Sequence, residues 1–568
     1  MKTKYFLGLA LMALLFAGCE KVLDKQPLDQ FTNDNFWSSE TNVEIYANYF
    51  YNTFTGYGNS GGSGDFYFPT LNDNQAASGF ALWNYTSVPA SNGTWSSCYT
   101  EIRRANIMIE KVPGIESMSE AARNNWVGVA RLYRAWQHYT LVRNFGDCIY
   151  VDKVLDVTDE DKDGYLFASR TDRDVVMDKV LEDLNFACSN ITMNASSRVA
   201  FNNALAQAMK AEICLYEGTF AKYRSSADGQ KAPDSGRATS YLNAAKQACQ
   251  AIMSNGMYAL NGTYKSNYDS ENLSSNKEMI LFKHYQTGAL THSLIDYTCS
   301  STMQSGMSKA GFESYLFLDG KPMATTSYDT NDHAVMNADG NMDISHMLAV
   351  RDGRLAQTID AVLMYRGQSY VRFGVGMATT SSTGYGVLKF DNASYPVNFR
   401  NQTSSNYSDA PIFWLAEIYL NYAEACAELG ACSQADLDMS INKLRDRAGM
   451  PHLTTTPTPD PANNMNVSDL IWEIRRERRV ELMFDVRDRY WSLIRWHQLD
   501  KLDTTKYPDQ VRGAWVGEAN KAQATITADG YIDATNDGVR NYESKHYLSP
   551  IPSGQIDLNA NLGQNPGW

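Results

Sequence analysis

Apolar side chains recur every three or four residues along much of this chain, a spacing that places them on one face of a helix. Residues 123–144 show it most clearly, and Phe145-Gly146-Asp147 follows as a natural helix end. The apolar positions of this segment are Trp126, Val129, Ala130, Tyr133, Trp136 and Leu141. We therefore predict an amphipathic helix that ends at Gly146.

The same spacing predicts further helices in pairs. Alanines 204, 208 and 211 form a stripe of small side chains, which lets neighbouring helices approach closely. Such pairs resemble tetratricopeptide (TPR) units, although loops such as 222–237 make the repeat irregular. The fold class predicted is mainly α, with a TPR-like scaffold at about 120–254 and 411–500. The predicted helices are 173–188, 201–217, 239–253, 411–429 and 434–448.

Two stretches lack helical spacing. Residues 55–100 and 255–409 are rich in Gly, Ser, Thr, Asn and Tyr, with only short alternating runs such as Met279 to Lys283. Loops of this length within a compact protein are often functional. We expect one domain over 19–568, in which these loop-rich parts face a ligand and a few short strands occur.

One predicted helix carries charges and large apolar groups on the same face. Its positions are Ile474, Glu477, Arg478, Glu481, Phe484, Asp488, Trp491 and Arg495. Buried charges need partners, so we expect them to pair with each other or with the C-terminal segment. The functional alternative makes Glu477 and Glu481 an acid and a base. We favour the structural role, because arginine neighbours would keep both carboxylates ionised.

The C-terminal segment 547–568 is irregular. Pro550 and Pro552 flank Ile551, and Pro566-Gly567-Trp568 end the chain. Prolines at this spacing exclude a helix interior or a central strand. We predict an extended strap that docks on the charged helix.

The N-terminus has the order of a lipoprotein signal. Lys2 and Lys4 precede an apolar run that ends in Ala17-Gly18-Cys19. Residues 1–18 are predicted to be removed, and Cys19 to be lipidated; an ordinary signal peptide with an incidental cysteine is the alternative. The formal net charge of −14 argues against a nucleic acid partner, which requires a basic face.

Other motifs are weaker. None of the nine cysteines forms a C-x-x-C, so we expect no disulfide framework. Asp159, Asp161 and Asp163 resemble the start of a calcium loop, but Arg170 stands where the final glutamate belongs, so a solvated acidic turn is favoured. No cofactor or metal is expected. Gly56 to Gly61 matches a dinucleotide motif without the strand before it and the helix after it, and is interpreted as a loop.

Aromatic residues are abundant, with 34 Tyr, 22 Phe and 11 Trp. Flat apolar rings next to amides and carboxylates suit carbohydrate recognition, although core packing is the alternative for each ring. The candidate ligand-binding residues are Phe66, Tyr67, Asn72, Asp73, Trp83, Tyr85 and Tyr297.

Many motifs occur in the order typical of the SusD/RagB family, and the chain resembles that family over almost its whole length. They include Phe36-Trp37, Arg134-Ala135-Trp136 with Phe145-Gly146-Asp147, Asp319-Gly320-Lys321-Pro322, Arg351-Asp352, Leu420 to Ala425, Glu477 to Phe484 with Arg495-Trp496, and the C-terminal segment. Asp485-Val486 and Trp568 depart mildly from the family pattern.

The resemblance implies a lipid-anchored protein at the outer membrane, facing the cell surface. It implies a SusD-like helical fold with TPR-like units, and a SusC-like TonB-dependent barrel as partner. Members capture oligosaccharides and pass them to the barrel, and they are not enzymes. A RagB-like importer of peptides or glycopeptides stays open as an alternative. A surface glycoside hydrolase and a TPR adaptor are less favoured, because the sequence marks no acid/base pair in a cleft and an adaptor leaves the aromatic loops unexplained.

Overall fold

The computed structural model of the chain describes most of its length. The residues described are 36–59, 64–67, 71–77, 82–156, 158, 162–299, 306–330, 342–360, 363–365, 368–370, 381–400, 402–485, 487–517 and 525–568. The predicted signal segment 1–18, the lipidation site Cys19, and Asp159 and Asp161 of the acidic turn lie outside these ranges.

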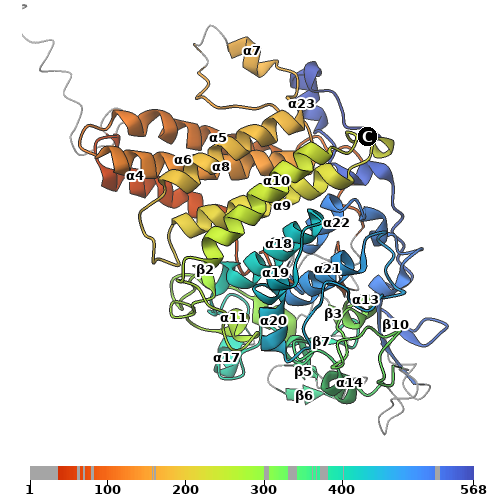
Figure 1. Cartoon of the computed structure of the whole chain (residues 1–568). Helices are drawn as coiled ribbons and strands as arrows, with labels where there is room; N and C mark the ends of the chain where they lie inside the picture. Colours follow the sequence, from red (N-terminus) through yellow and green to blue (C-terminus); the bar gives the residue numbers. More distant parts are fainter. Residues whose placement is uncertain are drawn as a thin grey trace, which may run out of the picture.

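Long helices make one layer of the molecule, drawn in orange and yellow in Figure 1. Neighbours along the chain pack against each other, with α6 between α5 and α8, and α10 against α9. The mainly α prediction is confirmed, and the helices predicted at 123–144, 173–188, 201–217 and 239–253 are present. The helices of this layer are α4 (Glu40–Ala47), α5 (Gly93–Lys111), α6 (Glu120–Phe145), α8 (Arg173–Asn190), α9 (Asn203–Tyr223) and α10 (Ser235–Met253).

Local sequence sets the ends of these helices. The hydroxyl of Ser119 accepts from the Ala122 amide at 3.2 Å and caps α6, and the side chain of Asn202 caps α9 at 2.8 Å. Gly146 ends α6 with φ +72°, a conformation that favours glycine. On α9, a Cβ at Gly218 would lie 2.8 Å from Leu242 of α10. Small residues therefore let this pair pack closely.

Helix α18 (Leu415–Glu428) joins the two hydrophobic cores of the protein. Leu415, Ile418 and Tyr422 face the core of the long helices. Ala416, Leu420 and Ala423 face a second core, formed with the following helices and the loop-rich segments. Figure 1 shows α18 between these two parts. Both apolar sides of α18 are buried, and the polar stripe between them, Glu417, Asn421, Glu424 and Glu428, is buried as well.

The structure corrects three predicted boundaries. Residues 410–414 form strand β8 rather than the first turn of a helix, and 434–448 holds two helices, α19 (Gln434–Asp438) and α20 (Ile441–Ala448). The charged helix is also two helices, α21 (Asp469–Glu481) and α22 (Arg489–Arg495). Phe484 between them has φ +69°, which no helix contains. The predicted single face over 474–495 is wrong for this reason.

Short elements fill the loop-rich segments. Strands occur as antiparallel pairs, β1 (Gln75–Ala76) with β3 (Gly306–Met307), β2 (Met279–Lys283) with β8 (Ala410–Trp414), β4 (Ile359–Asp360) with β7 (Gly386–Val387), β5 (Leu363–Tyr365) with β6 (Gln368–Tyr370), and β9 (Arg512–Trp515) with β10 (Tyr531–Asp533). The short helices are α7 (Lys162–Leu166), α11 (Ser266–Asp269), α12 (Leu294–Cys299), α13 (Lys309–Glu313), α14 (Ile344–Val350), α15 (Leu355–Thr358), α17 (Val397–Arg400) and α23 (Ser553–Leu558).

Candidate functional site

Buried ion pairs hold α21 in place. Glu477 lies 2.6 Å from Arg354 and 2.9 Å from Arg445, and Glu481 lies 2.9 Å from Arg354 and also contacts Arg447. Burial by itself raises the pKa of both glutamates, but the arginines outweigh it and hold each pKa below 4.5. Two carboxyl groups that both stay ionised do not divide into an acid and a base.

Arginines from both charged helices meet on α18. Glu424 accepts from Arg478 at 2.8 Å, from Arg495 at 2.9 Å and from the Trp496 indole at 2.7 Å. Burial alone would raise the pKa of Glu424, but the arginines lower it by a larger amount, and the pKa falls to about 2. The charged residues therefore connect α21 and α22 to α18, α20 and the segment at Arg354.

The C-terminal strap differs from the prediction in shape and in place: residues 553–558 form the short helix α23 instead of extended chain, and the strap docks elsewhere. Asn565 donates to the carbonyls of Phe145 and Ser549 and accepts from Arg170 at 2.7 Å. Asn559 donates to the Ala168 carbonyl at 2.9 Å. The strap thus covers the end of α6 and the segment before α8. Its predicted pairing with the charges of α21 is wrong, since those charges are matched within the scaffold.

Four of the candidate ligand-binding residues are buried. Phe66 and Tyr67 lie in the second hydrophobic core. Asn72 accepts from the amides of Asn74 and Gln75, which shapes its own loop. Asp73 accepts two hydrogen bonds from Arg489, at 2.6 and 2.5 Å. The structure thus gives Asn72 and Asp73 internal partners, and their contact with a ligand stays a prediction.

The other three candidates are half-buried: Trp83 and Tyr85 pack against the C-terminal segment, and Tyr297 lies elsewhere. The Trp83 ring stacks on His546 with centroids 4.0 Å apart, and its indole donates to the Asn541 carbonyl at 2.5 Å. The Tyr85 hydroxyl accepts from Asn92 at 2.6 Å. Tyr297 lies on α12, in another part of the fold. The structure therefore does not gather the seven candidates into one site.

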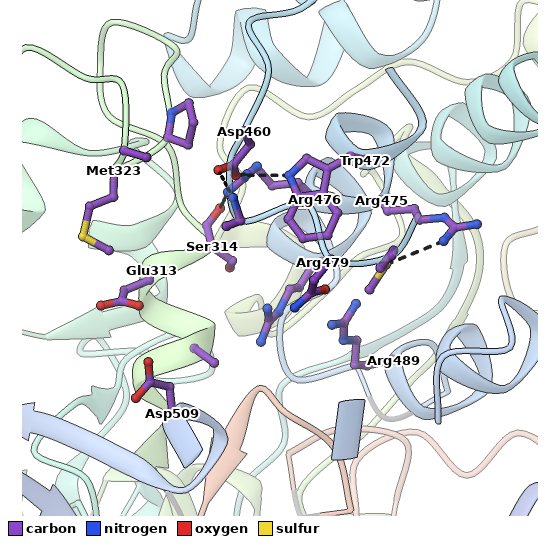
Figure 2. Close-up of a pocket in the computed structure, with 16 residues that line it drawn as sticks. Glu313, Ser314, Met323, Asp460, Trp472, Arg475, Arg476, Arg479, Arg489 and Asp509 are labelled. Atoms are coloured by element: carbon purple, nitrogen blue, oxygen red, sulfur yellow. Dashed lines mark hydrogen bonds and ion pairs between the residues drawn. The ribbon is translucent and has the colours of Figure 1, made fainter. Parts of the chain in front are cut away.

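A cavity of about 430 Å³ opens beside α21, between that helix, α13 and the turn after Leu318. Figure 2 shows Trp472 and Arg476 along one wall, Arg479 and Arg489 on another, and Glu313 with Asp509 opposite them. Met323 lies at its edge. The volume falls in the range of small-molecule sites, and the walls combine an aromatic face with charged groups.

A second cavity of about 190 Å³ lies next to the first. Arg489 lines both, and Asn72, Asn74, Tyr490 and Trp491 belong to the second. Asn72 thus lines the second cavity, and Asp73 contacts Arg489, which lines both. Two of the predicted loop residues therefore lie beside the cavities.

Most residues that line the larger cavity are absent from the candidates predicted from the sequence. Trp472, Arg476 and Arg479 are spaced i, i+4 and i+7, which places them on one face of α21, away from the buried glutamates. That stripe is a usable signal. Met323 directly follows the Asp319 to Pro322 motif, and nothing in its sequence indicates that it meets α21.

The remaining features considered in the sequence concern metal ions, disulfides and membrane-spanning helices. Within the described residues, no cluster of three or more His, Cys, Asp or Glu side chains suits a metal ion, and Asp163 is exposed. The cysteines at 98, 148, 188, 214, 249, 426 and 432 are free thiols. Across the described ranges, every helix falls short of the length and apolar character that crossing a bilayer requires.

Comparison with known proteins gives one consistent picture. A family model described as "SusD family" matches residues 250–568, and one described as "Starch-binding associating with outer membrane" matches 22–215. A SusD-like protein of Bacteroides ovatus is 25% identical over 525 residues, 87% of this chain and 83% of that protein. SusD-like protein P2 of Formosa agariphila is 24% identical over 487 residues, 84% of this chain and 80% of that protein.

Solved structures share the fold. The crystal structure of a SusD-like carbohydrate binding protein from Bacteroides fragilis superposes with a TM-score of 0.70 at 21% sequence identity. The match covers 93% of this chain and 100% of that one.

Proposed function

Because the chain belongs to the SusD family, we propose that it is a cell-surface glycan-binding lipoprotein that captures oligosaccharides and delivers them to a SusC-like TonB-dependent outer-membrane barrel. The family description of the N-terminal match names starch binding and association with the outer membrane. The similar B. fragilis structure is titled a carbohydrate binding protein. Both support the proposal.

The cavity beside α21 carries the proposal. Sugar rings present apolar C–H faces that stack on aromatic rings, and hydroxyl groups that pair with charged and amide side chains. Trp472 supplies a half-buried aromatic face at the wall of a cavity of about 430 Å³. The adjoining cavity of about 190 Å³ adds Asn72, Asn74 and Trp491. The two cavities meet at Arg489, and together they offer room for more than one sugar unit.

We propose a binding role rather than catalysis. The carboxyl pair suggested by the sequence, Glu477 and Glu481, is bound to arginines on both members. A hydrolase needs one carboxyl group whose pKa is raised to act as acid, and here the pKa of each is lowered.

Attachment to the membrane is assigned to a lipid on Cys19, as part of the same proposal. A Cys19→Ala variant is expected to leave the membrane fraction and appear soluble in the periplasm. Retention of that variant in the outer membrane would contradict the lipid anchor.

The capture step is tested with the full lipoprotein in detergent micelles. We expect oligosaccharides from a panel of polysaccharide digests to raise its unfolding temperature, and a tryptic peptone to leave it unchanged. Stabilisation by peptone alone would favour the RagB-like peptide importer instead. For delivery, an affinity-tagged chain should co-purify with a TonB-dependent barrel from its native outer membrane; recovery without a barrel would contradict the partner.

A further inference from the structure

The two sides of the larger cavity differ in how their charges are compensated. Glu313 and Asp509 lie on one side, and Arg479 and Arg489 on the other (Figure 2). Lys309 lies 2.7 Å from Glu313 and 2.9 Å from Asp509. Arg512 lies 3.2 Å from the other oxygen of Asp509. Arg512 also lies 3.3 Å from Asp529, so three carboxylates share two cations and this side has no excess of positive charge.

The arginine side has one carboxylate for two guanidinium groups. Arg489 binds both oxygens of Asp73, at 2.6 and 2.5 Å. Arg479 lies 3.3 Å from the same Asp73, with its other bonds going to the neutral Asn74 side chain and the Asp73 carbonyl. These hydrogen bonds use the Nε and Nη2 atoms of both arginines. This side carries one uncompensated positive charge.

The pKa of Arg479 agrees with that imbalance. Burial lowers it from 12.5 to about 10; Asp73 opposes the shift, while Arg489 and Arg476 add to it. An anion placed beside Arg479 and Arg489 would remove the repulsion between them.

The other arginines of the cavity have carboxylate partners of their own. Arg475 pairs with Glu428 at 3.1 Å, a carboxylate that it shares with Lys222, whose side chain is 34% exposed and therefore solvated. Arg476 pairs with Asp460 and, at 3.1 Å, with Glu473. Within the cavity, the excess of positive charge is therefore concentrated at Arg479 and Arg489.

We propose that this cavity binds an acidic saccharide, with a carboxylate or sulfate group at Arg479 and Arg489 and with hydroxyl groups donating to Glu313 and Asp509. The planar fork of arginine suits both anions, which accept paired charge-assisted hydrogen bonds. Trp472 and Met323 provide the apolar surface for the ring. This inference rests on the proposed function and names its ligand class.

Met323 offers a test that leaves the ion-pair network intact. It is half-buried at the cavity edge, so Met323→Glu places a negative charge at the entrance and Met323→Gln is the neutral variant of the same size. The probes are oligogalacturonides with their carboxyl-reduced forms, and sulfated oligosaccharides with their desulfated forms, titrated by calorimetry into the full chain in detergent. The first pair reports on a carboxylate and the second on a sulfate.

We expect at least one acidic probe to bind about tenfold or more tightly than its neutral form, and Met323→Glu to weaken it about tenfold relative to Met323→Gln. Arg479→Gln should weaken the same probe about 10- to 100-fold, as loss of charge-assisted bonds does. The affinity should also fall as salt rises from 50 to 500 mM, whereas that of neutral probes should not.

Equal binding of acidic and neutral probes, or equal affinity of the two Met323 variants, would overturn the acidic class and leave glycan binding standing. If the protein binds peptides but neither acidic nor neutral glycans, the acidic ligand class and the proposed glycan-binding function are both overturned.

Discussion

The guanidinium of Arg489 binds both carboxylate oxygens of Asp73, a residue 416 positions earlier in the chain. The pair connects the loop before β1 with the start of α22. Both residues are buried, and the neighbouring Arg479 depends on the same carboxylate. One side chain from the N-terminal loops therefore keeps two arginines of the C-terminal helices in place.

Replacing Asp73 by Asn should destabilise the protein by about 3–5 kcal/mol, because removing one partner of a buried pair leaves charge uncompensated. Chemical denaturation at pH 7 measures the change. Asp557, exposed on α23, provides the control, and Asp557→Asn should change the free energy of unfolding by less than about 0.5 kcal/mol. Equal stability of the two variants would show that the Asp73 pair does not contribute.

Glu481→Gln should have an effect of similar size, about 3–5 kcal/mol, because Arg354 and Arg447, both buried, each lose one of their charged partners. The exposed pair of Glu182 with Lys179, at 3.0 Å, is the contrast. Glu182→Gln should cost below about 1 kcal/mol. If Glu481→Gln unfolds at the same denaturant concentration as Glu182→Gln, the scaffold role of α21 is wrong.

The sequence was sufficient to predict α6, α8, α9 and α10, because their apolar spacing and their ends are local properties. It did not predict α5, whose first eight residues lie in the segment 55–100 that was interpreted as loop-rich. Ser119 and Gly146 set the limits of α6 whatever packs around it. The break at Phe484 could not be predicted in this way. Arg489 reaches Asp73 only if the helix stops and α22 starts in a new direction, and that contact is made across the whole chain.

The site was harder to predict than the fold. Aromatic residues of the loops were chosen by composition, yet Phe66 and Tyr67 lie in the core. Composition does not distinguish a ring that packs from a ring that binds. Trp472 and Arg479 belong to a helix whose buried glutamates drew the structural interpretation, although the opposite face of that helix lines a cavity.

Protonation of His292 should destabilise the fold in acid. Burial lowers its pKa from 6.5 to about 3, so the folded state keeps it neutral while the unfolded state gains a proton below pH 6.5. Its contribution is complete above pH 6.5 and is lost as pH falls toward 3. The stability of the unmodified protein should fall more steeply from pH 6.5 to 4.5 than that of His292→Asn, measured by denaturation at each pH.

The docking of the C-terminal strap depends on the side chain of Asn565. Its side chain bonds to two carbonyls and to Arg170 and is buried, whereas the exposed Asn561 makes one side-chain bond, to Phe167. Asn565→Ala should cost about 2–4 kcal/mol and raise hydrogen exchange over 545–568, since the carbonyls of Phe145 and Ser549 and the Arg170 guanidinium all lose this partner. Asn561→Ala should cost about 0.5–1 kcal/mol. Unchanged exchange in Asn565→Ala would mean that other contacts hold the strap.

Alanine variants of Trp83 and Trp472 test separately whether each ring contributes to packing or to glycan binding. The Trp83 ring stacks on His546 of the C-terminal segment, so Trp83→Ala should lower the free energy of unfolding by about 2 kcal/mol, less than for a fully buried ring. Trp472 lines the cavity instead, so Trp472→Ala should weaken glycan binding about tenfold, because a stacking surface is removed. Calorimetry with a bound oligosaccharide and denaturation of both variants measure the two effects. If Trp83→Ala abolishes binding while folded and Trp472→Ala binds normally, the ligand lies against the loop at residues 82–85 and not beside α21.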